Sequence, residues 1–251
     1  MTPALQSTPS LPLPPPIDEI CGQGPVALFL DFDGTLVPIA SGPDAIAVPA
    51  DLGARLEQLA ARLDGRLGVV SGRGLDDIDR HVGAMAVARA GSHGAHRVTA
   101  DGTVLGDDPA PLGANIVGEL QALAARYEAL FENKAHGAAI HYRKKPEHGS
   151  AIEERAGVIA QTHGLTVKTG KCVVELVRPG AEKGGAVAAF MAQTPFADSR
   201  PIFVGDDVTD EDGFAAATRF GGFGIAVGER QARGARYALP DVKDVHAWLK
   251  L

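Results

Sequence analysis

The chain has 251 residues, which is enough for one large or two modest hydrophobic cores. Apolar residues make up 45% of it and charged residues 22%, as is typical of a folded globular protein, and this excludes a chain that is disordered throughout. The net charge of −7 argues against a surface for nucleic acid or anionic lipid. We therefore expect neither partner, and an anionic substrate would need a local positive pocket.

The two cysteines and the N-terminus carry information about the compartment. Cys21 and Cys172 lack the paired spacing of a zinc site or a disulfide framework, which favours a reducing environment. Residues 1–22 begin with a proline-rich stretch that lacks the features of a secretory signal, and we predict a disordered tail there. No apolar run approaches the roughly 18 residues of a membrane span. We expect a cytoplasmic protein, with a monomer favoured.

Strands and helices alternate after the tail. Residues 25–30 form a continuous apolar run, typical of a strand buried on both faces. Leucines at helical spacing predict a helix over 52–63, which Gly65 ends. Further strands are predicted at 67–70 and 85–90. Because strands that alternate with helices form right-handed crossovers, a parallel sheet is expected.

The middle of the chain has a different pattern. A long helix is predicted over 112–132 and a second over about 147–162, and short strands are predicted at 138–143, 165–168 and 172–177. Two helices with short strands suggest an inserted α+β unit over 108–178. Alternation then resumes with a helix from about Lys183, a strand at 202–205, a helix at 211–218 and a strand at 224–227. The core of this α/β protein is thus built from 23–107 and 179–251.

The strongest chemical signal is AspPheAspGlyThrLeu at 31–36, directly after the first strand. An extended chain repeats every two residues, so Asp31 and Asp33 point toward one site and Phe32 points away. Two carboxylates in one cleft repel each other unless a cation holds both or their roles differ. In the catalytic interpretation Asp31 attacks phosphorus and Asp33 is the acid and base. In the alternative the pair only ends the strand or caps a helix.

Two further segments can bind phosphate. Ser71, Gly72 and Arg73 follow the second strand at a helix start, where free N–H groups, the serine hydroxyl and the arginine charge suit an anion. Lys183 begins the first helix after the insert and can neutralise phosphoryl oxygens and the attacking carboxylate. Taken alone, such a tripeptide is often only a turn, and such a lysine is usually a surface residue.

A metal site is predicted in GlyAspAspValThrAspGluAsp at 205–212, which follows the strand 202–205. Clustered carboxylates offer the hard oxygens that Mg²⁺ prefers. We assign Asp206 to the metal and Asp207 or Asp210 to its outer shell, with Asp31 and the backbone carbonyl of Asp33 completing the site. A helix N-terminus also favours carboxylates through its dipole alone, and Asp212 is expected to be structural for that reason.

These segments all follow strands of one sheet, and ligands of open α/β folds collect at the carboxyl ends of strands. In chain order the four segments resemble the motifs of the haloacid dehalogenase (HAD) superfamily of phosphotransferases. The resemblance implies a Rossmann-like parallel-sheet core with an inserted cap. It also implies Asp31 as nucleophile, Asp33 as acid and base, Ser71 and Lys183 as phosphate binders, and Asp206 as metal ligand.

Polar residues alternate along the strands of the insert. His141 and Arg143 share one strand face, and Lys171 and Glu175 share another, which leaves Cys172, Val174 and Leu176 for the core. Such faces suit a polyhydroxyl ligand, although patterning alone favours a solvated sheet face.

Four segments together resemble the trehalose-6-phosphate phosphatase family, over nearly the whole chain from about residue 25. They are GlySerHisGlyAla (91–95), Lys134 with HisTyrArg (141–143), GlyLys and the following glutamate and proline (170–179), and the acidic segment 205–212. The resemblance implies a mobile cap in which Lys171 and Glu175 engage the distal glucose and Lys134, His141 and Arg143 lie nearby.

Several histidines fall outside the core motifs. His96 departs from the acidic residue that the family usually has there. His93 is a candidate for lining the cleft, with a hydrogen-bonded turn residue as the alternative. His163 and His246 are expected to be structural or on the surface.

The expected function is Mg²⁺-dependent hydrolysis of trehalose 6-phosphate by a stand-alone phosphatase. A phosphatase for sucrose 6-phosphate or mannosylglycerate phosphate would share the core motifs and differ only in the cap. A non-catalytic sugar-phosphate sensor is a rival from another class, and the two intact aspartates argue against it. A phosphomutase would leave phosphate on its product.

Overall fold

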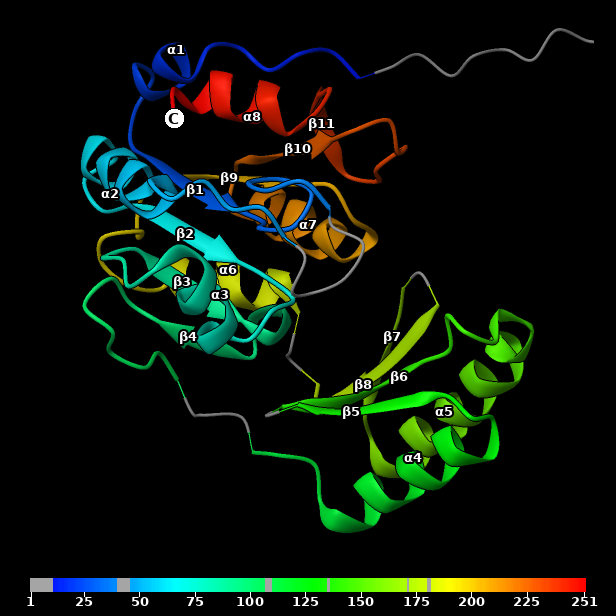
Figure 1. The fold of residues 1–251 in the computed structure, drawn as a ribbon. Helices are drawn as coiled ribbons and strands as arrows, with labels where there is room; N and C mark the ends of the chain where they lie inside the picture. The colour runs from blue at the N-terminus through cyan, green and yellow to red at the C-terminus, as the bar shows by residue number, and fades with distance from the viewer. Residues whose placement is uncertain (1–10, 40–45, 107–109, 135, 171, 180–181) are drawn as a thin grey trace, which may run out of the picture. The chain divides into compact units, whose positions relative to one another are not determined.

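The computed structural model describes residues 11–39, 46–106, 110–134, 136–170, 172–179 and 182–251. The chain divides into two compact units, Met1–Leu105 with Lys183–Leu251, and Gly106–Glu182. Each unit has its own sheet (Figure 1), and the hydrophobic core clusters of the two units are separate. The predicted insert, 108–178, falls within the second unit.

The first unit is built on a seven-stranded sheet with the order β11-β10-β9-β1-β2-β3-β4. Neighbouring strands are parallel except for the pair β3 and β4, which confirms the predicted parallel α/β fold. The chain leaves β1 in one direction along the sheet and returns to β9 on its other side, so β1 lies at a topological switch point. The strands are β1 (Val26–Leu30), β2 (Leu67–Val70), β3 (Ala88–Gly91), β4 (His96–Val98), β9 (Arg200–Gly205), β10 (Phe223–Val227) and β11 (Ala235–Leu239).

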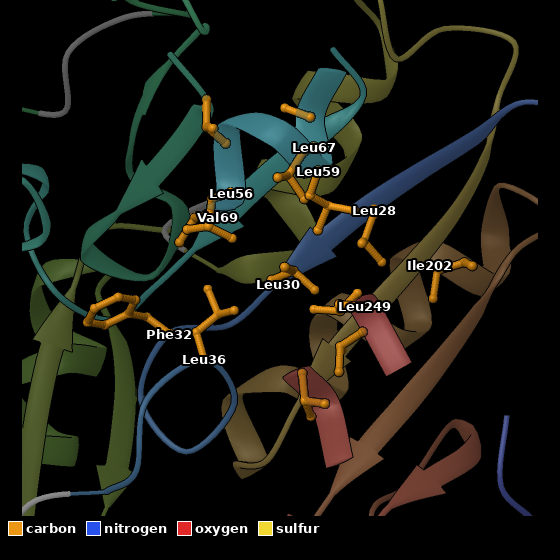
Figure 2. Packing of buried hydrophobic residues seen from close by; sticks show 14 of the residues in the cluster. Leu28, Leu30, Phe32, Leu36, Leu56, Leu59, Leu67, Val69, Ile202 and Leu249 are labelled. Atoms are coloured by element: carbon orange, nitrogen blue, oxygen red, sulfur yellow. The ribbon is translucent and has the colours of Figure 1, made fainter. Parts of the chain in front are cut away.

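Side chains of β1 alternate between two hydrophobic cores, one on each face of this sheet. Leu28 and Leu30 join the core beneath α2 (Leu52–Arg62), α3 (Leu75–Val82) and α8 (Val242–Leu249), part of which Figure 2 shows. Phe29 joins the opposite core, beneath α6 (Lys183–Met191) and α7 (Glu211–Arg219). Because both faces are covered, the strand is apolar throughout, as the sequence predicts.

The predicted disordered tail is wrong for residues 11–22. Ile17–Cys21 forms the short helix α1, and Ile17 and Ile20 are buried in the core. Before it, the Pro12 carbonyl accepts a hydrogen bond from Ala238 N–H of β11, and the Pro15 carbonyl accepts one from the Trp248 indole. Proline keeps its carbonyl acceptor, so a proline-rich segment can still be anchored along its length. Residues 1–10 of the predicted tail lie outside the described residues.

The second unit is a four-stranded antiparallel sheet in the order β5-β6-β8-β7, covered on one face by two helices. Its core side chains include Ile140, Val174 and Leu176. The helix predicted over 112–132 is too long, because α4 ends at Arg126 and the chain then forms β5. The elements are α4 (Ala114–Arg126), β5 (Leu130–Lys134), β6 (Gly137–His141), α5 (Gly149–His163), β7 (Thr166–Gly170) and β8 (Val173–Val177).

Short 3₁₀ segments complete the described structure. They are η2 (Ser92–Gly94), η3 (Pro146–His148) and η4 (Val208–Asp210), and the first and last of them follow β3 and β9 at the carboxyl ends of the core strands. Within the described ranges, no helix has the length and apolar character needed to cross a membrane.

Candidate active site

Asp31 directly follows β1 and forms a buried ion pair with Lys183, the first residue of α6. The Lys183 Nζ donates to Asp31 Oδ1 at 2.6 Å and to Asp210 Oδ1 at 2.6 Å. Lys183 and Asp31 are each 3% exposed, and Asp210 is fully buried. Three segments far apart in sequence therefore meet in one desolvated, charge-assisted network.

Asp33 lies beside Asp31 in sequence but has a different partner. Its two carboxylate oxygens accept hydrogen bonds from Arg73, from Nε at 2.6 Å and from Nη2 at 2.8 Å. Arg73 Nη1 also donates to Asp77 at 2.7 Å. Phe32, between the two aspartates, is buried in the core, as the strand period predicts. Arg73, predicted to bind phosphate, thus contacts the second aspartate of the first motif.

The predicted phosphate-binding turn follows β2. Ser71 is fully buried, and its Oγ accepts a hydrogen bond from Arg73 N–H at 3.1 Å. His93 has a positive φ of 59° and donates its own N–H to the Ser71 carbonyl at 2.9 Å. A Cβ added at Gly72 would lie 2.7 Å from the His93 ring. His93 therefore lies against this turn, and a larger residue at position 72 would require the His93 ring to shift.

The acidic segment after β9 divides into carboxylates with different partners. The Oδ1 of Asp206 is buried without a hydrogen-bond partner among the described residues. Asp207 is exposed, and its side chain caps η4 by accepting from Val208 N–H at 2.7 Å. Asp210 uses one oxygen for Lys183 and the other for Asp207 N–H, at 2.9 Å. Asp210 therefore anchors this segment to Lys183.

The Asp206 carboxylate packs against the backbone of Gly34. This glycine has a φ of +84°, and a Cβ there would lie 2.2 Å from Asp206 Oδ2. Gly34 thus serves both the left-handed turn after the first motif and the close approach of Asp206.

Burial and mutual repulsion perturb the titration of this cluster. Burial and the neighbouring Asp210 raise the pKa of Asp31, while Lys183 opposes the shift. The same two causes raise the pKa of Asp206 from 3.8 to about 7. Burial would lower the pKa of Lys183, but Asp210 and Asp31 outweigh it and raise that pKa. Lys183 therefore stays protonated, and the three carboxylates keep a formal excess of two negative charges when ionised.

Asp31, Asp206 and Asp210 form the group that fits a cation in the described part of the chain. One carboxylate oxygen from each lies within 4.8 Å of the others. The unpartnered Asp206 oxygen, the all-oxygen donor set and the excess negative charge suit a hard divalent cation such as Mg²⁺. Asp207, predicted in the outer shell of the metal, is not in this group of side chains, and Asp33 is predicted at the metal through its backbone carbonyl.

The second unit gathers charged side chains on the sheet face opposite its core. Lys134 Nζ lies 3.1 Å from Glu175 Oε1, and His141 Nε2 lies 2.7 Å from Glu132 Oε2. Glu132 pairs across the strands with Ala139, which in turn pairs with Glu175, so both carboxylates are on one face. Glu132 was not predicted, because residues 130–132 were assigned to a helix.

The remaining predicted residues lie elsewhere. Arg143 is exposed and follows the end of β6, so it does not continue the strand face of His141. Lys171 lies outside the described residues. Cys172, Val174 and Leu176 pack in the core of this unit, as predicted. His163 contacts Glu119 at 3.0 Å, and His246 donates to the Leu36 carbonyl at 2.8 Å.

The fold matches that of a known class of hydrolases. A solved phosphatase of the haloalkanoate (HAD) enzyme superfamily from Bacteroides thetaiotaomicron has a TM-score of 0.62 to this chain at 17% identity, covering 90% of this chain and 93% of that one. The parallel core sheet with an additional α/β unit is thus the fold of HAD-like hydrolases.

Sequence comparison narrows the class. A family model described as trehalose-phosphatase matches residues 29–242. The chain is 38% identical over 228 residues to the trehalose-6-phosphate phosphatase of Escherichia coli (strain K12), covering 90% of this chain and 85% of the relative. It is 42% identical over 205 residues to a probable trehalose-phosphate phosphatase of Sinorhizobium fredii, covering 80% of this chain and 77% of the relative. The chain belongs to the trehalose-phosphatase family.

Proposed function

We propose that this protein hydrolyses trehalose 6-phosphate to trehalose and inorganic phosphate through an aspartyl-phosphate on Asp31. The observation that carries the proposal is the buried Asp31 carboxylate at the carboxyl end of β1, held by Lys183 within a cluster that has an excess of negative charge. The fixed orientation of Asp31 suits a nucleophile, and the family relationship supplies the substrate class.

The reaction has two steps. In the first, the Asp31 oxygen that is not bonded to Lys183 attacks phosphorus, the bond between phosphorus and the sugar oxygen breaks, and Asp33 gives a proton to that oxygen. In the second, a water oxygen attacks the phosphorus of the acyl phosphate, the bond to Asp31 breaks, and Asp33 takes the proton from water. Asp33 thus returns to its starting state after one turnover.

The contact between Asp33 and Arg73 bears on the first step. Both Asp33 oxygens accept hydrogen bonds from Arg73, an arrangement that suits the carboxylate and not the acid. Since Asp33 must carry a proton to act as donor, we expect Arg73 to release at least one of these oxygens when substrate binds. Arg73 is then able to turn toward the phosphate, the role that its sequence position suggests.

The phosphate oxygens are bound by the residues around Asp31. Lys183, the Ser71 hydroxyl and the backbone N–H of Gly72 offer the positive charge and donors that a transferring phosphoryl group requires. A Mg²⁺ ion, held by Asp31 and Asp206 with the Asp33 carbonyl, would supply charge neutralisation at the phosphoryl group. Asp210 would orient Lys183. Asp207 would stabilise the metal-binding segment through its cap on η4.

The second unit is proposed as the cap that selects the sugar. Glu175 is 7% exposed although it lies on the sheet face opposite the core, and its ion pair with Lys134 orients both groups. Ordered donors and acceptors on a sheet face suit the hydroxyls of a disaccharide. We assign Lys134, His141, Arg143, Lys171 and Glu175 to this role, and His93 to the sugar-phosphate end.

The test is phosphate release from a panel of substrates by the purified protein, with Mg²⁺ or with chelator. The panel contains trehalose 6-phosphate, sucrose 6-phosphate, mannosylglycerate phosphate and glucose 6-phosphate, and Asp31→Asn is the matched inactive control. We expect Mg²⁺-dependent release confined to trehalose 6-phosphate. Release from another sugar phosphate would contradict the substrate assignment, and binding without release would indicate a sensor.

A further inference from the structure

Arg230, in the loop after β10, binds the backbone of the acidic segment that follows β9. Its Nε donates to the Asp206 carbonyl at 3.0 Å, and its Nη2 donates to the Asp207 carbonyl at 2.9 Å. The third nitrogen, Nη1, donates to Glu211 Oε1 at 2.6 Å. One guanidinium thus binds two consecutive carbonyls and a carboxylate of the segment that carries Asp206.

The fold explains how Arg230 reaches this position. β10 lies beside β9 in parallel register, so the loops after the two strands emerge at the same edge of the sheet. Gly228 follows β10 with a φ of +85°, a left-handed turn that favours glycine. Glu211, at the start of α7, also accepts a hydrogen bond from Arg233 N–H at 3.1 Å. The loop after β10 and the start of α7 are therefore fixed to each other next to Arg230.

The segment 206–210 is held from two directions. On the inner side, Asp210 bonds Lys183 and the Asp207 N–H. On the outer side, Arg230 bonds the carbonyls of Asp206 and Asp207. Because the carbonyl and the N–H of the peptide that joins Asp206 to Asp207 are both hydrogen-bonded, the backbone on the carboxyl side of Asp206 is fixed, and its carboxylate packs against Gly34 with Oδ1 unsatisfied among the described residues. An arginine suits this task because its planar fork fixes two acceptors at once, whereas a lysine offers a single flexible point of charge.

We propose that Arg230 is a positioning residue that sets the Mg²⁺ affinity of the site by fixing the backbone of Asp206. This inference rests on the proposed metal site, although it does not require that the substrate be trehalose 6-phosphate. Groups that orient metal ligands typically change metal affinity about 10- to 100-fold when removed. We expect a loss of that size in Arg230→Ala, while the chelator-treated protein stays folded.

The experiment measures Mg²⁺ binding by titration calorimetry and Mg²⁺-dependent thermal stabilisation, for wild type, Arg230→Ala and Arg230→Lys. Both variants are expected to bind Mg²⁺ about 10- to 100-fold more weakly, because lysine keeps the charge but cannot bridge the two carbonyls. Phosphate release by both should return to the wild-type maximum when Mg²⁺ is saturating. Arg233→Ala is the matched control, because Arg233 is exposed and contacts Glu211 through its backbone N–H.

Two results would overturn the proposal. Unchanged Mg²⁺ affinity in Arg230→Ala would leave the residue a purely structural role, and wild-type affinity in Arg230→Lys would show that charge matters and not the fork. If the Mg²⁺ affinity falls as expected but no sugar phosphate in the panel is hydrolysed by wild type, the inference stands and the proposed function fails.

Discussion

Replacing Asp206 by asparagine should stabilise the protein in chelator and destabilise it relative to wild type in Mg²⁺. Burial and repulsion from Asp210 raise the pKa of Asp206 from 3.8 to about 7. A carboxyl whose pKa is higher in the folded than in the unfolded state does not lower the free energy of unfolding at a pH below its unfolded pKa. As the pH rises from the unfolded to the folded pKa, the free energy of unfolding falls. The cost to wild type therefore grows between about pH 4 and pH 7 and is constant above that.

The loss of stability that Asp206 causes in wild type can be calculated from the shift of its pKa. Each pKa unit corresponds to about 1.4 kcal/mol, so a rise to about 7 gives roughly 4 kcal/mol at pH 8 and roughly 2 kcal/mol at pH 5.5. Solvent screening of a partly exposed side chain reduces these values, and we take half, about 2 and about 1 kcal/mol. For a chain of this length, Asp206→Asn should melt about 4–8 °C higher than wild type at pH 8, and about half as much higher at pH 5.5.

With Mg²⁺ present, wild type should be more stable than Asp206→Asn. A ligand at about 100 times its dissociation constant stabilises the folded protein by about 2.7 kcal/mol, and Asp206→Asn loses much of this gain together with the ligand oxygen. Thermal unfolding of both proteins at pH 5.5 and 8, in chelator and in Mg²⁺, provides the measurement. Asp212→Asn is the control, because Asp212 is an exposed carboxylate of the same acidic segment. A variant that is less stable than wild type in chelator at pH 8 would refute the reasoning.

Three further substitutions test other parts of the site. Lys183→Met should lower the unfolding free energy by about 3–5 kcal/mol, because it leaves two buried carboxylates unpaired, and adding Asp210→Asn should recover part of that loss in denaturant titrations without restoring turnover. Gly34→Ala should reduce Mg²⁺ affinity in calorimetry, since its Cβ would displace the Asp206 carboxylate; an unchanged affinity would argue against Asp206 as a ligand. Glu175→Gln should raise KM for trehalose 6-phosphate at least about 10-fold and leave hydrolysis of a small aryl phosphate unchanged, whereas the exposed Glu128→Gln should change neither.

The core strands and motif residues could be predicted because their signals are local. A strand buried on both faces is a continuous apolar run, and β1, β2 and β9 all have one. The first motif follows β1 directly, so the strand period alone separates Asp31 and Asp33 from Phe32. Ser71, Lys183 and Asp206 are predicted at the site by the same logic, since each stands at the end of a strand or the start of a helix.

Other features depend on contacts that no local pattern records. β5 was missed because α4 ends through a turn in which Glu128 has a φ of 52°, a conformation that no glycine or proline marks in the sequence. The N-terminal segment was predicted to be disordered from its prolines, whereas its order comes from Trp248 and Ala238, more than two hundred residues away. Arg230 lies in a loop without a motif, and its role follows from the adjacency of β9 and β10.

Arg73 and Arg230, at the carboxyl edge of the sheet, bind different kinds of group. Arg73 binds the side chain of Asp33, which changes its protonation in the mechanism proposed above, and that mechanism therefore requires a reversible contact. Arg230 binds Asp206 and Asp207 through their backbone carbonyls, which do not titrate, so these two contacts do not depend on the protonation of either aspartate. In the proposed mechanism, Asp206 can thus stay fixed while Asp33 exchanges its proton, because two different arginines hold them.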